Sequence, residues 1–385
     1  MPTEMIFHVS DCFAVLLYLV CTVFLACLLN NKKIFHLFIV LGAFHFISAY
    51  LNSLGGTDAR LYFSRASTLD AANLFATFNQ GTHFIVFLTW PLVNFLNLSY
   101  LGCHIVYALA GLFGYYFLLR ILLEHAPNRS MIYWMLFLLF LPGSHKWTSF
   151  IGKDAVIFAA NAAMIYSFLK HKWGLFVLAT VLSALIRLPV PIIMICGFVF
   201  VTFLFGKNTS GILKMSVGIL VTVLLIVLMP SISERIGWNE DDSFDEFMEN
   251  KEAKNQGQES SIDMSSSSQP SKMFAFLYRP LFFDSHNSSA LFASCENIIW
   301  LLMSWQILRN ILSGIKREYR LMFWQCAIAF GLSWVASSFA VSNLGLVFRL
   351  KYTFFPLFYC LLLFSMHNHR LDSLANHSSP PYNTP

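Results

Sequence analysis

Long apolar runs recur along almost the whole chain, and they constrain its fold more than any other feature of the sequence. The runs with helical character are 12–30, 34–52, 101–122, 131–143, 155–170, 173–187, 189–206, 211–229, 291–312, 320–341 and 352–366. An apolar run of about 18 residues is typical of a membrane span, because lipid offers backbone groups no hydrogen-bond partner outside a helix. The pattern predicts an all-α, polytopic transmembrane bundle of about eleven spans.

Composition supports this class and excludes others. Hydrophobic residues make up 57% of the chain and charged residues only 12%, against about 25% charged in a typical soluble domain. The net charge of +5 is scattered, and no basic block alternates with aromatic residues, so we expect no nucleic-acid partner. The eight cysteines lie mostly in apolar runs without CxxC spacing, which predicts small buried hydrophobes. No cofactor or metal site is expected from these residues, and a requirement for a divalent metal is left open.

The distribution of Lys and Arg between the runs predicts the orientation in the membrane. One set of connections carries Lys32, Lys33, Arg120, Arg129, Lys170, Lys172, Lys207, Lys214, Lys316, Arg317 and Arg320. We expect this side to be cytoplasmic, with the N-terminus outside and the C-terminus inside. The stretch 83–97, broken by Trp90-Pro91, is expected to be a re-entrant or interfacial segment, which is tolerated where protein or water covers its backbone.

Changes in composition divide the chain into expected regions. The segment 230–290 is acidic and Ser-rich, which predicts an extracytoplasmic polar loop without a packed core of its own. The remaining regions are an N-terminal transmembrane bundle over 1–229, C-terminal transmembrane helices over 291–370, and a disordered cytoplasmic tail over 371–385.

Charged residues next to the runs on the outer side are the candidate site. Asp58 follows the second run, and a carboxylate there could take the proton from an attacking sugar hydroxyl. Cations hold a phosphate and stabilise charge on a departing pyrophosphate. The expected phosphate ligands are Arg187, Arg279, Arg349, Lys153 and Arg60. Further site candidates are Tyr62, Lys146, Asp154, Glu296 and Lys351.

Each candidate also has an ordinary structural interpretation. A charge at a helix end is commonly an interfacial anchor, and this interpretation is weighed for Arg60, Lys146, Lys153 and Lys351. Arg187 and Arg349 have apolar residues on both sides, which favours a site. Asp58 could instead cap the helix that follows it. If the site interpretation is right, Asp58, Arg187, Arg279 and Arg349 should converge on one cavity at the outer membrane boundary.

Several of these motifs resemble one family. Gly-Thr-Asp-x-x-x-Tyr at 56–62 resembles the opening motif of EpsG/O-antigen-polymerase-like (Wzy-like) membrane proteins, and more loosely the first-loop acidic motif of C-type membrane glycosyltransferases. Other segments similar to pieces of such proteins are Trp147–Asp154, Arg279-Pro280, Glu296-Asn297 and Asn343–Gly345 with Arg349. The first loop departs from the pattern, because it has a single Asp in place of an Asp-x-Asp or Glu-Asp pair. The largest outer loop is acidic, whereas polymerase loops are often basic.

The resemblance implies a function in the assembly of surface polysaccharide. It implies transfer or polymerisation of sugars from undecaprenyl-(pyro)phosphate-linked donors on the periplasmic face of a bacterial inner membrane. The implied partners are the polyprenyl-linked sugar, membrane lipid and other polysaccharide-assembly proteins. The departures from the family pattern leave the acceptor site and the metal requirement open.

Two other classes of function share these features. A transporter or flippase of lipid-linked oligosaccharide would use the same cations, but it needs charges deep within several helices and usually has an internal repeat. The charges here gather on one face and the sequence has no visible repeat, which favours the enzyme. A membrane scaffold, in which the clustering of charges is accidental, is the third class.

Overall fold

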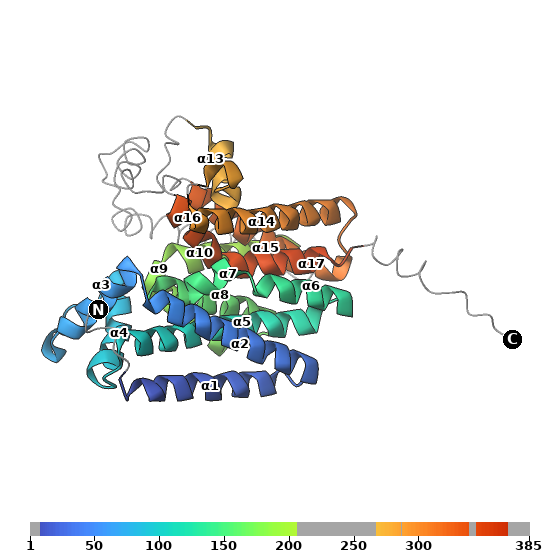
Figure 1. Cartoon of the computed structure of the whole chain (residues 1–385). Helices are drawn as coiled ribbons and strands as arrows, with labels where there is room; N and C mark the ends of the chain where they lie inside the picture. Colours follow the sequence, from blue (N-terminus) through green and yellow to red (C-terminus); the bar gives the residue numbers. More distant parts are fainter. Residues whose placement is uncertain (1–7, 206–266, 286, 339–343, 369–385) are drawn as a thin grey trace. The chain divides into compact units, whose positions relative to one another are not determined.

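A computed structural model of the protein describes residues 8–205, 267–285, 287–338 and 344–368 (Figure 1). These residues are helical, and their only β feature is an isolated bridge between Ile315 and Asn368. Six of the described helices are long and apolar enough to cross a membrane: Asp11–Leu28, Lys32–Ser53, Tyr100–His125, Ser288–Leu312, Arg317–Ser338 and Val347–Ser365. The all-α class with several candidate spans is therefore confirmed, whereas the total of eleven stays a prediction. The run 211–229, most of the loop 230–290, Asn343 and the tail 371–385 lie outside the described residues.

The chain divides into two compact units. Unit 1 comprises Met1–Glu124, Ile132–Pro191 and Tyr352–Pro356, and unit 2 comprises His125–Met131, Ile192–Lys351 and Leu357–Pro385. Each unit is described separately below.

The helices of unit 1 pack largely with their neighbours in sequence. They are α1 (Asp11–Leu28), α2 (Lys32–Ser53), α3 (Thr57–Thr68), η2 (Ala71–Asn73), α4 (Thr82–Asn94), α5 (Tyr100–His125), α6 (Arg129–Leu139), α7 (Pro142–Thr148), α8 (Lys153–Leu169) and α9 (Trp173–Arg187). The pairs α1–α2, α3–α4 and α8–α9 lie side by side (Figure 1). At about 1.5 Å per residue, α4 is only about 20 Å long, too short for a bilayer core of about 30 Å. This length fits the re-entrant or interfacial segment expected over 83–97.

One helix of unit 1 ends earlier than the apolar run predicts. The run 131–143 was expected to be continuous, but α6 stops at Leu139 and Pro142 begins the separate short helix α7. Proline has no N–H to donate within a helix, so it interrupts one and is favoured in the first turn of the next. The residues that follow the run, up to Thr148, are thereby helical as well.

A buried carboxylate fixes the starts of α1 and α5 at the same end of unit 1. Asp11 is fully buried, and its two oxygens accept from the Ser99 N–H at 2.9 Å and the Ser99 hydroxyl at 2.6 Å. The Ser99 hydroxyl oxygen accepts in turn from the Gly102 N–H at 3.2 Å, as an N-cap residue does. At this end Asn52, near the end of α2, also donates to the Lys146 carbonyl at 2.7 Å.

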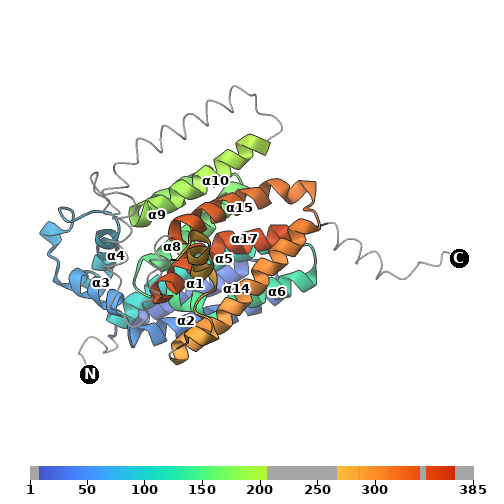
Figure 2. The same cartoon turned by 90° about the horizontal axis from the view of Figure 1, so that it is seen from above.

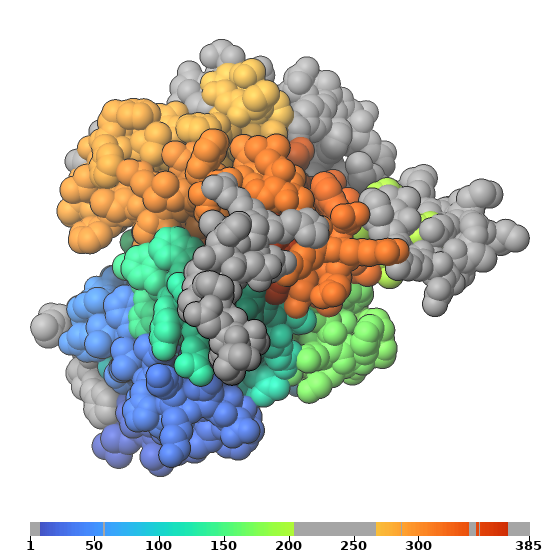
Figure 3. Space-filling model, turned by 90° about the vertical axis from the view of Figure 1, so that its right-hand side faces the viewer, coloured from blue at the N-terminus to red at the C-terminus, as the bar shows by residue number. Residues whose placement is uncertain are grey.

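Basic residues mark the opposite end of unit 1. The Lys170 ammonium lies 2.8 Å from a Glu124 carboxylate oxygen, and Arg120 donates to the Leu28 carbonyl where α1 ends. The turn from α1 to α2, coloured blue, lies on the face shown in Figure 3. Helix α5 separates the two ends by about 39 Å. Within unit 1, the connections expected to be cytoplasmic at Lys32-Lys33, Arg120 and Lys170-Lys172 thus share one end.

This segregation makes the orientation testable with reporter fusions. Fusions after Lys33 and Lys172 should report the cytoplasm, and a fusion near Asp70 should report the outer side, because Lys and Arg are retained on the cytoplasmic face. The same rule predicts that a fusion at Gln258, beyond the described residues, reports the outer side. Alkaline phosphatase and green fluorescent protein reporters distinguish the two compartments. Asp70 and Lys172 in the same compartment would contradict the orientation.

Helix α5 approaches its neighbours closely at a glycine. A Cβ at position 111 would lie 2.1 Å from the Thr148 carbonyl oxygen and 2.8 Å from His45 Nε2. Small residues allow such close helix contacts in membranes. Gly111→Ala should therefore destabilise unit 1 by about 1–3 kcal/mol through overpacking, although alanine is the better helix former. Gly331→Ala in α15 is the matched control, because a Cβ there meets no atom of the described residues within 4 Å. Equal melting temperatures for the two variants would refute the close contact.

Unit 2 contains most of the later helices. They are α10 (Pro189–Phe205, which begins in unit 1), α13 (Gln269–Tyr278), η3 (Phe282–Asp284), α14 (Ser288–Leu312), α15 (Arg317–Ser338), α16 (Leu344–Thr353) and α17 (Phe355–Ser365), the last two each having one end in unit 1. Figure 2 shows α10 beside α15, where Gln325 donates to the Thr202 hydroxyl at 2.7 Å. Helix α13 packs against α14 and α15.

Two expectations are corrected in unit 2. Residues 269–284 belong to the expected polar loop, but they form α13 and η3, and the side chains of Ala275–Tyr278 are buried. The run 352–366 is divided after Thr353 into α16 and α17, so the candidate span Val347–Ser365 consists of two consecutive helices. Pro356 lacks the N–H that would continue the helix by donating to the Tyr352 carbonyl, which explains the division.

Candidate functional site

An ion pair joins the start of α8 to the end of α9 in unit 1. Arg187 Nη2 lies 3.4 Å from Asp154 Oδ1, and the Asp154 side chain is only 1% exposed. The second terminal nitrogen, Nη1, donates to the Thr353 hydroxyl at 3.4 Å. Because α8 and α9 pack against each other, these residues meet although 33 positions separate them. Two acceptors on different elements therefore orient the guanidinium of Arg187.

A second cation lies at the same end of unit 1. Lys153 is the first residue of α8 and is half-buried. Gly81, just before α4, donates its N–H to the Leu185 carbonyl at 2.9 Å. A Cβ at position 81 would lie 3.6 Å from the Lys153 ammonium, and the φ of +75° at this position also favours glycine. Lys153 and Arg187 thus bring two positive charges to the adjoining ends of α8, α9 and α4.

Polar residues within the apolar helices form hydrogen bonds that connect α8 and α9 to Thr353, the residue that contacts Arg187. The Asn161 amide donates to the Thr353 carbonyl at 2.8 Å, and the Ser183 hydroxyl donates to the Asn161 carbonyl oxygen at 3.5 Å. All three residues are buried. Sequence reasoning missed them, although the isolated Asn161 and Ser183 in apolar runs are a recognisable sign of hydrogen bonding between membrane helices.

Asp58 is the second residue of α3 and its side chain is exposed. Gly56, with φ of +88°, occupies the N-cap position, and the Tyr100 hydroxyl donates to the neighbouring Gly55 carbonyl at 3.0 Å. Asp58 is therefore in the first turn, where a negative charge favours the positive end of the helix dipole, and is not the cap itself. Of its neighbours in the motif, Arg60 is exposed and Tyr62 is buried.

The Lys146 side chain is exposed next to an aromatic ring. Its ammonium lies 5.3 Å from the ring centroid of Trp147, in the range of a cation–π contact. An exposed lysine beside a tryptophan is typical of an interfacial anchor.

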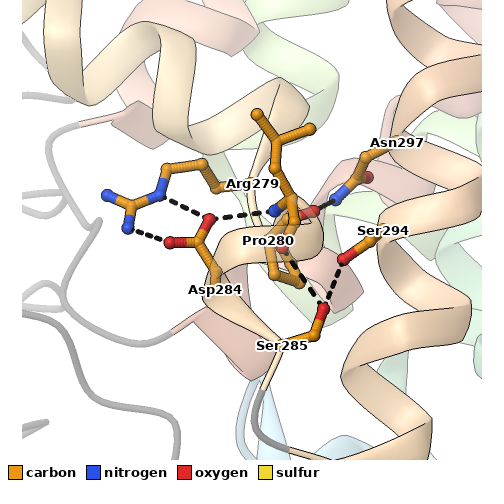
Figure 4. Close-up of polar contacts among 7 residues, drawn as sticks. Arg279, Pro280, Asp284, Ser285, Ser294 and Asn297 are labelled. Atoms are coloured by element: carbon orange, nitrogen blue, oxygen red, sulfur yellow. Dashed lines mark hydrogen bonds and ion pairs between the residues drawn. The ribbon is translucent and has the colours of Figure 1, made fainter.

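In unit 2, Arg279 is held by a nearby carboxylate (Figure 4). Its Nε donates to Asp284 Oδ2 at 2.9 Å, and its Nη2 hydrogen-bonds Oδ1 of the same carboxylate. The Leu281 N–H donates to this carboxylate as well, at 2.9 Å. The hydrogen bond to Asp284 raises the pKa of Arg279 above its ordinary value, so the guanidinium is charged at every physiological pH. This expected phosphate ligand therefore already has a bidentate carboxylate partner.

The turn after α13 is attached to α14 and to a buried lysine. Asn297 donates its amide to the Pro280 carbonyl at 2.7 Å, and Ser285 hydrogen-bonds Ser294 at 2.8 Å (Figure 4). Lys351 donates to the Asn297 carbonyl oxygen and, at 3.4 Å, to the Leu277 carbonyl. These bonds fix the turn relative to α14 and α16.

Lys351 departs from the interfacial-anchor interpretation weighed for it. Its side chain is 1% exposed, with the ammonium 5.3 Å from the Trp300 ring centroid and 4.4 Å from that of Phe348. The buried Glu296 attracts it electrostatically. Arg349, two residues earlier on α16, is half-buried.

The sequence-predicted site residues divide between the two units. Unit 1 holds Asp58, Arg60, Tyr62, Lys146, Lys153, Asp154 and Arg187, and unit 2 holds Arg279, Glu296, Arg349 and Lys351. Within unit 1, contacts bring Lys153, Asp154 and Arg187 together. The convergence of Asp58, Arg187, Arg279 and Arg349 on one cavity stays a prediction. Over the described residues, no group of three His, Cys, Asp or Glu side chains is placed to hold a metal ion.

Comparison of the chain with protein-family models, with curated proteins and with solved structures gives no match. The functional interpretation therefore depends on the chemistry and placement of the residues described above.

Proposed function

We propose that this protein transfers or polymerises sugars from undecaprenyl-(pyro)phosphate-linked donors at the outer face of a bacterial inner membrane, during synthesis of a surface polysaccharide. The observation that carries the proposal is the pair of cations, Lys153 and Arg187, at one end of unit 1. Two cations from different helices suit the two phosphates of a lipid diphosphate. The same unit carries the exposed carboxylate of Asp58.

Each residue has a definite task in this reaction. Asp58 accepts the proton of the attacking sugar hydroxyl, which makes the oxygen a better nucleophile. Arg187 and Lys153 bind the departing (pyro)phosphate and stabilise the negative charge that develops on it. Asp154 and Thr353 orient the Arg187 guanidinium before substrate arrives, so less ordering is needed on binding. Arg60, exposed on the same helix as Asp58, is a further phosphate ligand.

A transporter of lipid-linked oligosaccharide is the second candidate, and one observation favours it. Lys351 and Glu296 are ionisable groups buried within unit 2, and ionisable groups at membrane depth commonly mark a translocation or proton path. A transferase has no evident need for this buried pair.

An assay in two physical settings separates the candidates. Purified protein in detergent micelles, which enclose no compartment, is incubated with lipid-linked oligosaccharide, and chain growth is followed on a gel. The same protein in sealed vesicles is tested for movement of a fluorescent lipid-linked oligosaccharide between leaflets. The enzyme should extend chains in micelles. Movement between leaflets without chain growth would overturn the proposal in favour of the transporter.

A further inference from the structure

Two histidines meet in the interior of unit 1. His45 of α2 and His145 of α7 are both fully buried, and their Nδ1 atoms lie 2.9 Å apart. On the far side of each ring, His45 Nε2 lies 3.1 Å from the Ala108 carbonyl oxygen, and His145 Nε2 lies 2.7 Å from the Leu139 carbonyl oxygen. Each ring therefore has a hydrogen-bonding contact at both of its nitrogens.

Counting protons shows that two neutral rings cannot make these three contacts. A carbonyl oxygen only accepts, so both Nε2 atoms must carry a hydrogen. A neutral imidazole has one N–H, and the two available hydrogens are then used on Ala108 and Leu139. The two Nδ1 atoms would face each other at 2.9 Å with a lone pair each, which is repulsive. A third proton between them turns this contact into an N–H···N hydrogen bond of ordinary length.

We propose that His45 and His145 bind one shared proton, so that the pair is a singly charged proton-binding site in the interior of unit 1, between the candidate span α2 and the short helix α7. Loading the site takes a proton from hydronium: one O–H bond breaks and leaves a water molecule, and an N–H bond forms at one Nδ1. This N–H donates to the lone pair of the other Nδ1.

Full burial opposes a positive charge on the pair, but a helix end and the face of an aromatic ring in its surroundings favour one. Leu139 is the last residue of α6, so His145 donates to a carbonyl at the partially negative end of a helix. The Tyr115 ring of α5 stacks on His145, with centroids 4.6 Å apart and planes 10° from parallel. Stacking on an electron-rich face stabilises a cation. The Phe44 ring contacts His145 edge-on at 4.8 Å.

Among the described residues, the other ionisable groups near the pair do not supply a carboxylate. Tyr115, on α5, hydrogen-bonds the Ser144 hydroxyl at 2.7 Å, and Tyr18, on α1, donates to the Gly42 carbonyl at 2.9 Å. Lys146 follows His145 on α7, and its side chain is exposed beside Trp147. Helix α8 contributes the apolar Phe158 ring, which contacts Tyr115. The charge of the pair is therefore stabilised by carbonyls and rings.

The position of the pair connects it to the candidate site. His45 lies seven residues before Asn52, or about 10 Å along α2, and about 20 Å from the other end of that helix. Proton-binding groups at such depth typically serve proton relays. Loss of the shared proton would leave two lone pairs between α2 and α7 and weaken that contact. Helix α7 leads within a few residues to Lys153 and Asp154, so the pair lies one short helix away from the end of unit 1 to which the proposed function assigns phosphate binding. The proton count does not depend on the proposed function.

Nitrogen NMR of the histidine rings tests the proposal directly. Protein labelled with ¹⁵N-histidine is placed in lipid nanodiscs at pH 8, where ordinary histidines, which titrate near pH 6.5, are neutral. We expect ring signals typical of a protonated pair in the unmodified protein. These signals should disappear in His45→Asn, whose amide N–H can donate to His145 Nδ1 without an additional proton. Neutral ring nitrogens throughout the unmodified protein at pH 8 would overturn the proposal. This outcome is observed on the unmodified protein alone, so it does not depend on whether a variant folds.

His104→Asn is the matched control. His104 is also fully buried in unit 1, but its Nδ1 donates to the Tyr100 carbonyl at 2.8 Å and its Nε2 has no hydrogen-bond partner in the part of the chain that the structure describes. One contact needs one proton, so a neutral ring suffices. The signals of the protonated pair should persist in this variant, and their loss would show that they come from another histidine.

The dependence of the melting temperature on pH is an independent test, because the proposal predicts the direction of the change. A folded protein that keeps a proton which the unfolded chain releases becomes less stable as the pH rises. The melting temperature of the unmodified protein should therefore fall from pH 6.5 to 9 relative to His45→Asn. A pair buried in the neutral form predicts the opposite, because the unfolded histidines then bind protons that the folded protein does not. A rise in relative stability with pH would overturn the proposal.

Discussion

Asp58→Asn should reduce the rate of chain growth by about 10² to 10⁴, the usual contribution of a general base. The amide keeps the shape of the side chain and its carbonyl oxygen, but it no longer accepts a proton from the acceptor hydroxyl. Binding of lipid-linked substrate should be nearly unchanged, because the proposal assigns the phosphate to Lys153 and Arg187. The measurement is chain growth by purified protein, with the dissociation constant of the lipid-linked substrate determined in parallel.

Asp70→Asn is the control for the loss of one negative charge in the same outer segment. Asp70 is exposed and stands just before η2, and no catalytic task is assigned to it. Chain growth with Asp70→Asn should remain near that of the unmodified protein. Unchanged growth with Asp58→Asn would remove Asp58 from the mechanism and favour the transporter.

Arg187→Met should have the largest effect on stability, because it removes the guanidinium from the buried carboxylate of Asp154. Removing one partner of a buried ion pair typically costs about 3–5 kcal/mol, mostly through the charge that stays buried. The Asp154 side chain is 1% exposed and that of Arg187 is 24% exposed, so the carboxylate cannot recover its hydration without rearrangement. Thermal unfolding in detergent measures the loss. Arg65→Met is the control, since Arg65 is exposed on α3 and should change stability little.

Arg187→Lys separates the charge from the shape of the side chain. The two terminal nitrogens of Arg187 contact Asp154 and Thr353, which lie on different elements. A lysine ammonium is a single point charge without the planar fork, so it should keep one of these contacts and lose the orientation given by both. Substrate binding should weaken although the charge is conserved, and stability should fall less than with Arg187→Met. Affinity and melting temperature equal to those of the unmodified protein would refute the phosphate-binding role.

Local chemistry made several parts of the structure predictable. The helices α1, α2, α5 and α14 follow from apolar runs whose backbone must bond internally in lipid. The pairing of Arg279 with Asp284 could also be predicted from the sequence, because Asp284 lies five positions after Arg279 and a turn begins at Pro280. The ends of some helices were less predictable, as at Pro142, because a proline inside an apolar run can kink a helix or end it.

The sequence by itself determined the helical class, because an apolar run within a single segment is enough to require a helix in lipid. It also predicts the sidedness of the basic residues and the set of charges from which the site is drawn. Only the tertiary structure shows which side chains these charged groups contact. Asp154 meets Arg187, and Thr353 joins unit 1 from a distance of 166 residues. Lys351 is buried against Asn297, and His45 faces His145 across 100 residues. Contacts of this kind depend on how helices pack, and in an apolar bundle many packings bury similar hydrophobic surface, so the local pattern does not select among them.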